Sequence, residues 1–285
     1  MAFKMKNREE SGYFSNLYEV HETARDSDYP KVSIIIPTQN SAVMISDTLE
    51  SLLIQDYSDF EIIVIDASST DRTLEIIRSL KDPRIRVYSV SSYSRYAMLN
   101  KGITHAYGTY LNFLYPGDFY IHKSVLKEVL RLSLGDPKAS LIYGGTMLRD
   151  GKSETKILYR ELTLDLLKSG KQPTSLQACW FKNDVFREIG KFNGDLEQRG
   201  GFDLLCRFAI NGRLTYKSTS RVVSDYDLRY VTRKMIVNRF FETLSIINKY
   251  FGFSYVLKWL IRQEDSTRYL KLWIKSMRLA LFGKT

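Results

Sequence analysis

Residues 60 to 66 read Phe-Glu-Ile-Ile-Val-Ile-Asp, and the architecture can be built outward from this run. Its apolar residues follow one another without alternation, which is typical of a strand buried on both faces of a sheet. A second run, Val32–Ile36, ends at Pro37, and the apolar residues between the two runs recur at near-helical spacing. Two strands with a helix between them predict a right-handed βαβ unit with parallel strands.

The same alternation continues toward the C-terminus. Strands are predicted at residues 84–90, 109–114 and 141–143, and helices at 69–80, 96–107 and 121–134. The second half is more mixed. It predicts helices at 162–168 and 202–210, and short strands at 176–181, 214–216 and 222–223. The pattern as a whole indicates the α/β class, with a mostly parallel sheet flanked by helices.

Polar residues follow the predicted strands where a parallel sheet binds its ligands, beyond the carboxyl ends. They are Thr38 and Asn40, Asp66, the segment 91–95 and Asp118. The chain has no Gly-x-Gly-x-x-Gly after the first strand and no Gly-x-x-x-x-Gly-Lys-Ser/Thr. The usual dinucleotide-binding fold and the P-loop are therefore unsupported.

Several blocks in a fixed order carry a resemblance to a known family. Residues 33–40 read SIIIPTQN and residues 61–71 read EIIVIDASSTD, and further matches follow at 100–118, 172–178 and 190–192. Together they resemble family 2 glycosyltransferases over residues 31 to 225, in particular a bacterial subgroup with a degenerate Asp-x-Asp motif. The resemblance implies the Rossmann-like GT-A fold, here followed by a C-terminal helical appendage.

The resemblance implies a nucleotide-sugar donor and a divalent metal, Mn²⁺ or Mg²⁺, on its diphosphate. Asp118 would hold this metal, since hard cations prefer carboxylate oxygens. Arg95 and Asn100 are candidates for contacting the diphosphate. The remaining nucleotide-sugar contacts expected from the resemblance are Pro37, Thr38, Asn40, Asp66 and Ser68.

The sequence departs from the family pattern where the chemistry lies. Ala67 replaces the second Asp of the "DDGSTD" block, and of the "DSDD" block only Asp118 remains. The acidic pair that normally precedes "D-L-x-x-R" reads Gly200-Gly201. The expected catalytic base is therefore missing, and Asp203, Glu197 or Asp195 would have to substitute, with Asp203 as the named candidate.

Each of these residues also has a purely structural interpretation. Asp66 could cap the end of its strand, Asp118 could be a turn residue, and Asp203 could be a solvated or helix-capping acid. Asn100 could simply open a helical turn, and Arg95 could be an exposed surface residue.

Composition limits the function classes further. Hydrophobic residues make up 44% and charged residues 26% of the 285, which excludes wholesale disorder and fibrous architectures. The two cysteines, Cys179 and Cys206, are too few for a disulfide framework, which indicates a protein of a reducing compartment. Both side chains are expected to be buried in the core. No secretory signal and no spanning segment is visible, so we expect a cytoplasmic protein.

The net charge of +10 is concentrated at one end of the chain. Residues 229–285 contain 12 Lys and Arg against 3 Asp and Glu, so the remainder is nearly neutral. A nucleic-acid binder with a uniformly basic surface is therefore disfavoured. We expect a mobile leader at 1–30, a GT-A domain at 31–228 and a basic amphipathic helical tail at 229–285.

The tail has two interpretations. The apolar residues of 230–251 fall on one face of a predicted helix. A last helix is predicted after Asp265-Ser266, with apolar residues on one face and basic residues on the opposite face: Arg268, Lys271, Lys275 and Arg278. Such helices lie in anionic membrane interfaces, here the inner face of the plasma membrane. Alternatively, the helices pack on the body with their charges solvated.

Two functions remain open, and a basic nucleic-acid-binding protein is a third, weaker alternative. The first is an enzyme that transfers a sugar to a glycan or lipid-linked acceptor with inversion, in cell-surface polysaccharide biosynthesis. The second is a degenerate relative that binds a nucleotide-sugar or a partner transferase without turnover.

Overall fold

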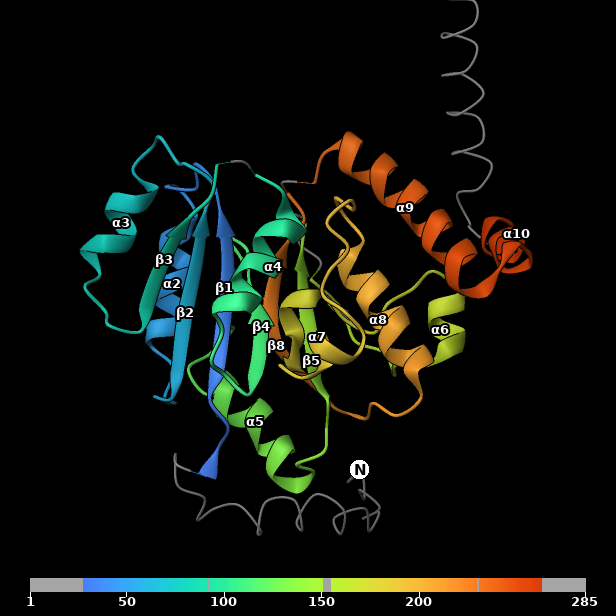
Figure 1. Cartoon of the computed structure of the whole chain (residues 1–285), viewed down its shortest axis with the longest axis horizontal. Coiled ribbons are helices and arrows are strands. Elements are labelled where there is room, and N and C mark those ends of the chain that lie inside the picture. The colour runs from blue at the N-terminus through green and yellow to red at the C-terminus, as the bar shows by residue number, and fades with distance from the viewer. Residues whose placement is uncertain (1–27, 92, 151–154, 230, 263–285) are drawn as a thin grey trace, which may run out of the picture.

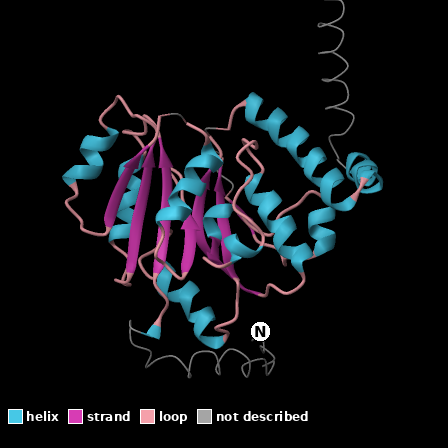
Figure 2. Ribbon diagram, in the orientation of Figure 1, coloured by secondary structure: helices cyan, strands magenta, loops and turns pink. Residues whose placement is uncertain are grey.

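The computed structural model describes residues 28–91, 93–150, 155–229 and 231–262. Its centre is an eight-stranded sheet with the order β3-β2-β1-β4-β7-β5-β6, in which β8 also pairs with β5. The strands form one central layer with helices on both faces (Figure 2). The helix α3 lies beyond one edge of this layer, and α9 and α10 lie at the other end of the molecule (Figure 1).

The four strands of the first half are parallel, as predicted. They are β1 (Val32–Thr38), β2 (Phe60–Asp66), β3 (Ile85–Ser89) and β4 (Tyr110–Phe113). Every residue of β1, β2 and β4 is buried, which explains the absence of alternation in their sequences. The strand order reverses at β1, between β2 and β4, so the carboxyl ends of these strands surround the crevice where such sheets bind ligands.

The second half adds β5 (Leu141–Arg149), β6 (Lys156–Leu158), β7 (Cys179–Lys182) and β8 (Tyr216–Asp227). The strand expected at 176–181 begins only at Cys179, because Leu176–Ala178 form a turn of 3-10 helix. The two short strands expected at 214–216 and 222–223 are one strand, β8, whose pairing with β5 shifts register next to Gly145. This irregularity explains why the sequence pattern predicts two strands instead of one.

The helices cover two hydrophobic clusters, one on each face of the sheet. One cluster includes α2 and α5, and the other includes α4 and α8 together with buried residues of α9 and α10. The bounds are α2 Ile45–Leu53, α3 Thr73–Ser79, α4 Arg95–His105, α5 Val125–Gly135, α6 Leu164–Lys168, α7 Val185–Glu188, α8 Gly200–Asn211, α9 Arg233–Phe251 and α10 Phe253–Arg262.

The first part of the basic tail packs on the body. Ile246 and Ile247 of α9 are buried in the same cluster as α8. The carboxylate of Glu242 accepts hydrogen bonds from the backbone amides of Glu197, Gln198 and Arg199, just before α8 begins. The helix α9 is therefore part of the folded domain.

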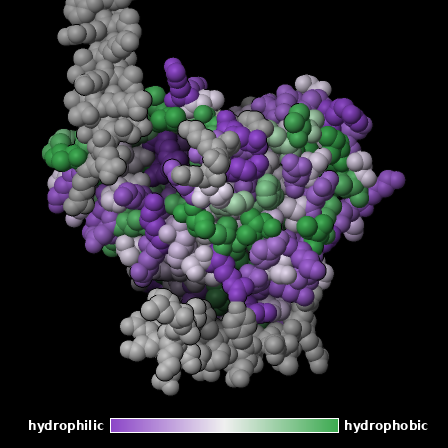
Figure 3. Space-filling model, turned by 180° about the vertical axis from the view of Figure 1, so that it is seen from behind, coloured by the Kyte–Doolittle hydropathy of each residue, from purple (hydrophilic) through white to green (hydrophobic). Residues whose placement is uncertain are grey.

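Some apolar residues of α9 and α10 stay exposed. The exposed fractions of Phe253 and Ile261 are 65% and 79%, and Val237 and Phe241 are also exposed. Apolar side chains reach the surface in patches separated by hydrophilic ones on the face seen in Figure 3. No helix in the described ranges is long and apolar enough to cross a membrane. The predicted last helix, with its basic face, lies outside the described residues.

The predicted leader lies outside the described residues up to position 27. Its last residues belong to the fold, because Tyr29 is buried with its ring edge-on to Tyr57.

Candidate functional site

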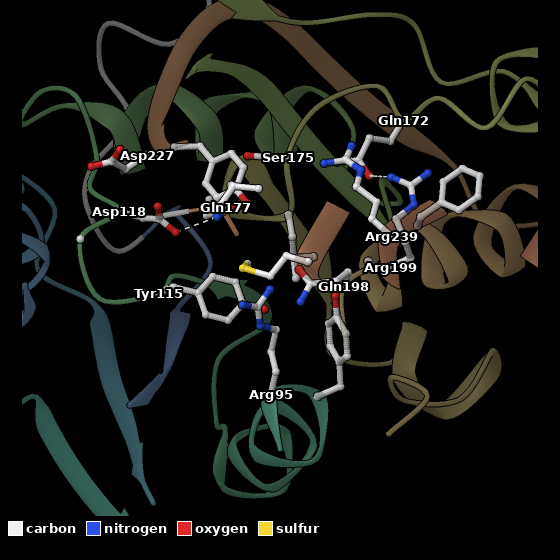
Figure 4. A pocket seen from close by; sticks show the side chains of 18 of the residues that line it. Arg95, Tyr115, Asp118, Gln172, Ser175, Gln177, Gln198, Arg199, Asp227 and Arg239 are labelled. Atoms are coloured by element: carbon white, nitrogen blue, oxygen red, sulfur yellow. Dashed lines mark hydrogen bonds between the residues drawn. The ribbon is translucent and has the colours of Figure 1, made fainter. Parts of the chain in front are cut away.

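A cavity of about 240 Å³ opens beside the carboxyl end of β4. Its walls come from the turn after β4, the start of α4, the segment 172–177 before β7, the start of α8, the end of β8, and α9 (Figure 4). Of the site residues predicted from the sequence, Arg95 and Asp118 line this cavity. The others lie outside it.

Asp118 is placed by a turn that continues β4. Its exposed fraction is 4%, and Gln177 donates a hydrogen bond of 2.6 Å to its carboxylate. Burial raises the pKa of Asp118 to about 7, although the bond from Gln177 opposes the rise. A buried carboxylate with this pKa is poised to gain stabilisation from a bound cation.

Asp227, at the end of β8, is the other carboxylate among the described residues that line the cavity. The Arg229 side chain donates three hydrogen bonds to it, and these bonds lower its pKa. Arg149 lies 3.5 Å from the same carboxylate while pairing with both oxygens of the neighbouring Asp225. Asp227 therefore remains ionised over the neutral range.

The predicted nucleoside residues lie along the carboxyl edge of β1 and β2. Thr38 and Asp66 are register partners, and Pro37 precedes Thr38 in β1. Both carboxylate oxygens of Asp66 accept hydrogen bonds from Ser69, one from the backbone amide and one from the hydroxyl. Asp66 therefore caps the turn after β2, the structural role that the sequence left open. It does not line the cavity.

Thr38 stands out at this edge of the sheet by the hydrogen bonding of its side chain. Its hydroxyl is buried and has no hydrogen-bond partner among the described residues. A buried hydroxyl without a partner costs free energy, which a ligand bound at the edge could recover.

Asn40 and Ser68 are exposed residues of the two loops above this edge. Both have positive φ, 46° and 52°, a conformation that non-glycine residues rarely adopt. The Asn40 side chain accepts a hydrogen bond from the Thr70 amide, and the Ser68 hydroxyl donates one to the Val90 carbonyl. The two loops are thereby fixed to each other and to the strand beyond.

Arg95 and Asn100 both lie on α4 but differ in placement. Arg95 points into the cavity, with its guanidinium 4.8 Å from the centre of the Tyr115 ring (Figure 4). The Asn100 side chain instead donates a hydrogen bond to the Phe192 carbonyl and accepts one from the Phe192 amide. Asn100 therefore holds a loop, and it does not line the cavity.

Asp203 lies on α8 but not in the cavity. Arg207 donates two hydrogen bonds to one carboxylate oxygen, and the Tyr250 hydroxyl donates one of 2.8 Å to the other. The bond from Tyr250 joins α8 to α9, whereas Arg207 lies on α8 itself. Asp195 and Glu197, the other substitutes considered, are exposed and also lie outside the cavity lining.

The described residues offer few ligands for a divalent metal. No group of three or more His, Cys, Asp or Glu that could hold an ion occurs among the described residues. Mg²⁺ in phosphate-processing sites is commonly held by one or two carboxylates together with the phosphates of the substrate. Asp118 fits that kind of site, because its buried carboxylate lines the cavity and carries a neutral amide as its side-chain partner.

Comparison with known proteins identifies the family of the chain. Residues 33–194 match the profile described as glycosyl transferase family 2. The chain belongs to glycosyl transferase family 2. It is 28% identical over 201 residues to a "PGL/p-HBAD biosynthesis glycosyltransferase" of Mycobacterium bovis, covering 70% of this chain and 77% of that protein. It is 29% identical to an uncharacterized glycosyltransferase of Rickettsia typhi, covering 63% and 58%.

Solved structures confirm the GT-A fold of this family member. TarS 1-349 of Staphylococcus aureus in complex with UDP superimposes with a TM-score of 0.61 at 20% identity, over 77% of this chain. The chain spans only 64% of that structure. The mannosyltransferase PcManGT of Pyrobaculum calidifontis, in complex with GDP-Man and Mn²⁺, gives a TM-score of 0.58 at 16% identity, over 95% of this chain and 87% of that one.

Gly200 and Gly201, where the sequence resemblance predicts an acidic pair, differ in their surroundings. A Cβ at Gly200 would lie 2.6 Å from the Tyr96 ring, so this position cannot accept a side chain without rearrangement. A Cβ at Gly201 would lie 3.5 Å from Leu176, an ordinary contact, and Gly201 lines the cavity. A Cβ therefore fits at position 201 without rearrangement, but not at position 200.

The wall of the cavity opposite Asp118 is formed by residues that are not predicted from the sequence. Gln172, Arg199 and Arg239 lie there, and Arg199 donates a hydrogen bond of 3.0 Å to the Gln172 side chain. The sequence feature that could have predicted Arg199 as a site residue is its position directly before Gly200-Gly201. No sequence feature indicates Arg239, because the sequence pattern assigns its helix to a separate tail.

Proposed function

We propose that the protein transfers a sugar from a nucleotide-diphosphate-sugar to a glycan or lipid-linked acceptor in cell-surface polysaccharide biosynthesis. The observation that carries the proposal is the buried carboxylate of Asp118, which lines the cavity beside the carboxyl end of β4 in a chain of glycosyl transferase family 2. Structures with the same fold hold UDP or GDP-Man, which supports a donor of this class.

The donor would lie across the carboxyl edge of the parallel strands. Its nucleoside would contact the edge that carries Thr38 and the loops of Asn40 and Ser68, where the Thr38 hydroxyl has no partner among the described residues. Its diphosphate would then reach Asp118, with Arg95 facing the same space. Arg95 is well suited to this contact, because a guanidinium can donate two parallel hydrogen bonds to phosphate.

Asp118 would hold the divalent metal, together with oxygens of the diphosphate. The metal would supply positive charge that stabilises the departing nucleoside diphosphate. Gln177 keeps the Asp118 side chain in place by its hydrogen bond.

Transfer with inversion requires a base that takes the proton of the acceptor hydroxyl. Asp227 is favoured over Asp203, because Asp227 lines the cavity and Asp203 is bound between two helices. The low pKa of Asp227 makes it a weak base, so we expect slow turnover compared with a family member that carries the acidic pair.

The alternative is a relative that binds the donor without turnover. The specific observation in its favour is the room left at Gly201, where the family's carboxylate would stand. The enzyme and the donor-binding relative both require nucleotide binding, and only the enzyme releases a nucleoside diphosphate from a nucleotide-sugar.

A thermal-unfolding screen tests the shared requirement. UDP, GDP or dTDP should raise the melting temperature more with Mn²⁺ than without it, and Asp118→Ala should remove the increment due to Mn²⁺. Asp47→Asn is the matched control, because Asp47 is an exposed acid of α2 outside the cavity. If no nucleotide raises the melting temperature under either condition, the donor site does not exist.

We propose further that the cytoplasmic protein binds the membrane from its inner face through residues 229–285. The exposed apolar side chains of α10, Phe253 and Ile261, support this placement. Phe253→Asp with Ile261→Asp should reduce co-sedimentation with anionic vesicles. Val43→Asp should not, since Val43 is 90% exposed but lies before α2, outside the tail. Equal binding of the variants would contradict a membrane role for α10.

A further inference from the structure

Three arginines line the cavity without an ion pair to any described residue. They are Arg95, Arg199 and Arg239. Elsewhere in the described chain, Arg86, Arg149 and Arg207 each pair with a carboxylate. Cations in a folded protein are usually left unpaired only where they are solvated or where a ligand completes them.

Arg199 is not solvated. Its exposed fraction is 3%, and its guanidinium lies 3.9 Å from the centre of the Phe202 ring. It donates hydrogen bonds to the Gln172 side chain and to the Gly170 carbonyl, while its Nε has no partner among the described residues. These neutral acceptors fix the orientation of the guanidinium without forming an ion pair with it, and the Glu242 carboxylate compensates its charge only in part.

Arg239 adds a second charge beside the first. Burial lowers the pKa of Arg199 to about 9, and the nearby charge of Arg239 acts in the same direction. Arg239 is exposed on α9, and α9 is held against the start of α8 by Glu242. The fold thus keeps two like charges together at one wall of the cavity, an arrangement that a bound anion would stabilise.

The two ends of the cavity differ in the ionisable residues that line them. Asp118, Gln177 and Asp227 lie on one side in Figure 4, and Gln172, Arg199 and Arg239 lie on the other. In the proposed function, the donor diphosphate and its metal occupy the carboxylate side. The arginine side is then left for a second anionic group.

We propose that Arg199 and Arg239 form a binding site for a phosphate group of the acceptor. The inference rests on the proposed function, because it assigns the opposite side to the donor. Phosphate suits the site, because it can carry two charges and offers paired oxygens to the planar guanidinium groups. The phosphate could belong to a lipid-linked acceptor or to a phosphodiester glycan.

Calorimetric titration of the full chain with inorganic phosphate tests the site. Phosphate should bind equally well with and without saturating UDP and Mg²⁺. Arg239→Gln should weaken phosphate binding at least fivefold while changing UDP binding less than twofold. Arg233→Gln is the matched control, since Arg233 is exposed on the same helix but does not line the cavity.

Two results would overturn the inference. Displacement of phosphate by UDP, or equal weakening of UDP and phosphate in Arg239→Gln, would assign the arginines to the donor. Absence of saturable phosphate binding would show that the proposed phosphate site does not exist. Failure of UDP itself to bind contradicts the proposed function instead, so the two failures are distinguishable. Arg199→Lys keeps the buried charge if Arg199→Gln does not fold, and should also weaken phosphate binding.

The source of the phosphate is identified with two further probes. A ten-carbon isoprenyl monophosphate that binds more tightly than inorganic phosphate supports a lipid-linked acceptor. Tighter binding of glycerol 3-phosphate supports a phosphodiester glycan. In either case, the stronger probe should lose its affinity in Arg239→Gln and keep it in Arg233→Gln.

Discussion

Asp203 provides a sharp test, because its sequence position and its contacts point to different roles. Its position, close to the family's missing acidic pair, predicts a substitute base. Its contacts predict a structural role, because it pairs with Arg207 within α8 and accepts a bond from the Tyr250 hydroxyl of α9. We therefore expect Asp203→Asn to lower stability while leaving chemistry almost unchanged.

The size of the effect follows from the bonds that change. The amide that replaces the carboxylate keeps one acceptor oxygen but loses the charge that attracts Arg207, and hydrogen bonds to charged groups contribute about 1.5–3 kcal/mol each. Arg207 also donates to the carbonyls of Ile189, Gly190 and Lys191, so its charge is not left without partners. We expect a loss of about 2–3 kcal/mol, which corresponds to a melting temperature lower by about 5–10 °C.

Calorimetry and the rate of nucleoside diphosphate release measure the two effects separately. Loss of a general base costs about 10²–10⁴ in rate. Asp203→Asn should change kcat by less than about threefold, whereas Asp227→Asn should reduce kcat at least about a hundredfold. Tyr250→Phe, which removes only one partner of the charged carboxylate, should cost about 1.5–3 kcal/mol. A hundredfold lower kcat in Asp203→Asn with an unchanged melting temperature would refute the structural role.

Three further predictions concern the pocket and its supports. Gly201→Asp should fold, because its Cβ would meet only Leu176 at an ordinary distance, and should raise kcat by supplying the missing carboxylate; an unchanged or lower kcat would contradict this. The raised pKa of Asp118 means that the folded state retains a proton that the unfolded state has lost, so stability should fall as pH rises from about 4 to about 7. Asp118→Asn should therefore become more stable relative to the parent across that range, and a pH-independent difference in melting temperature would contradict the burial of an uncompensated carboxyl. Glu242→Gln should lower stability by about 1–2 kcal/mol, because a charged acceptor for three backbone amides is lost, and urea unfolding that shows no change would contradict this support of α8.

The parallel half of the fold could be predicted well from the sequence, because its strands are buried on both faces. Val32–Ile36 and the run from Phe60 are short and rich in β-branched residues, which favours buried strands over buried helices. The strand β8 could not be recognised as one element, because many of its residues are exposed or half-buried and its pairing with β5 is irregular. The pattern of apolar and polar residues within one strand does not show which distant strand it pairs with.

The candidate site could be predicted only in part. Asp118 and Arg95 can be found because they follow or precede recognisable elements. Arg199 and Arg239 come together only through the packing of α9 on α8, which depends on contacts distant in sequence, such as that of Glu242. Asp66 matches the family motif and also caps the turn after β2 through Ser69, so its contact with the nucleoside stays a prediction.

The central claim is transfer from a nucleotide-sugar, and the most direct measurement is nucleoside diphosphate release by the full chain. Incubation with UDP-, GDP- and dTDP-sugars and Mn²⁺ should release the diphosphate from one of these donor classes. Release should be lost in Asp118→Ala and retained in Asp47→Asn. Binding of a nucleotide without release from any donor, with or without added phosphate-bearing acceptor, would contradict the enzyme and support the binding protein.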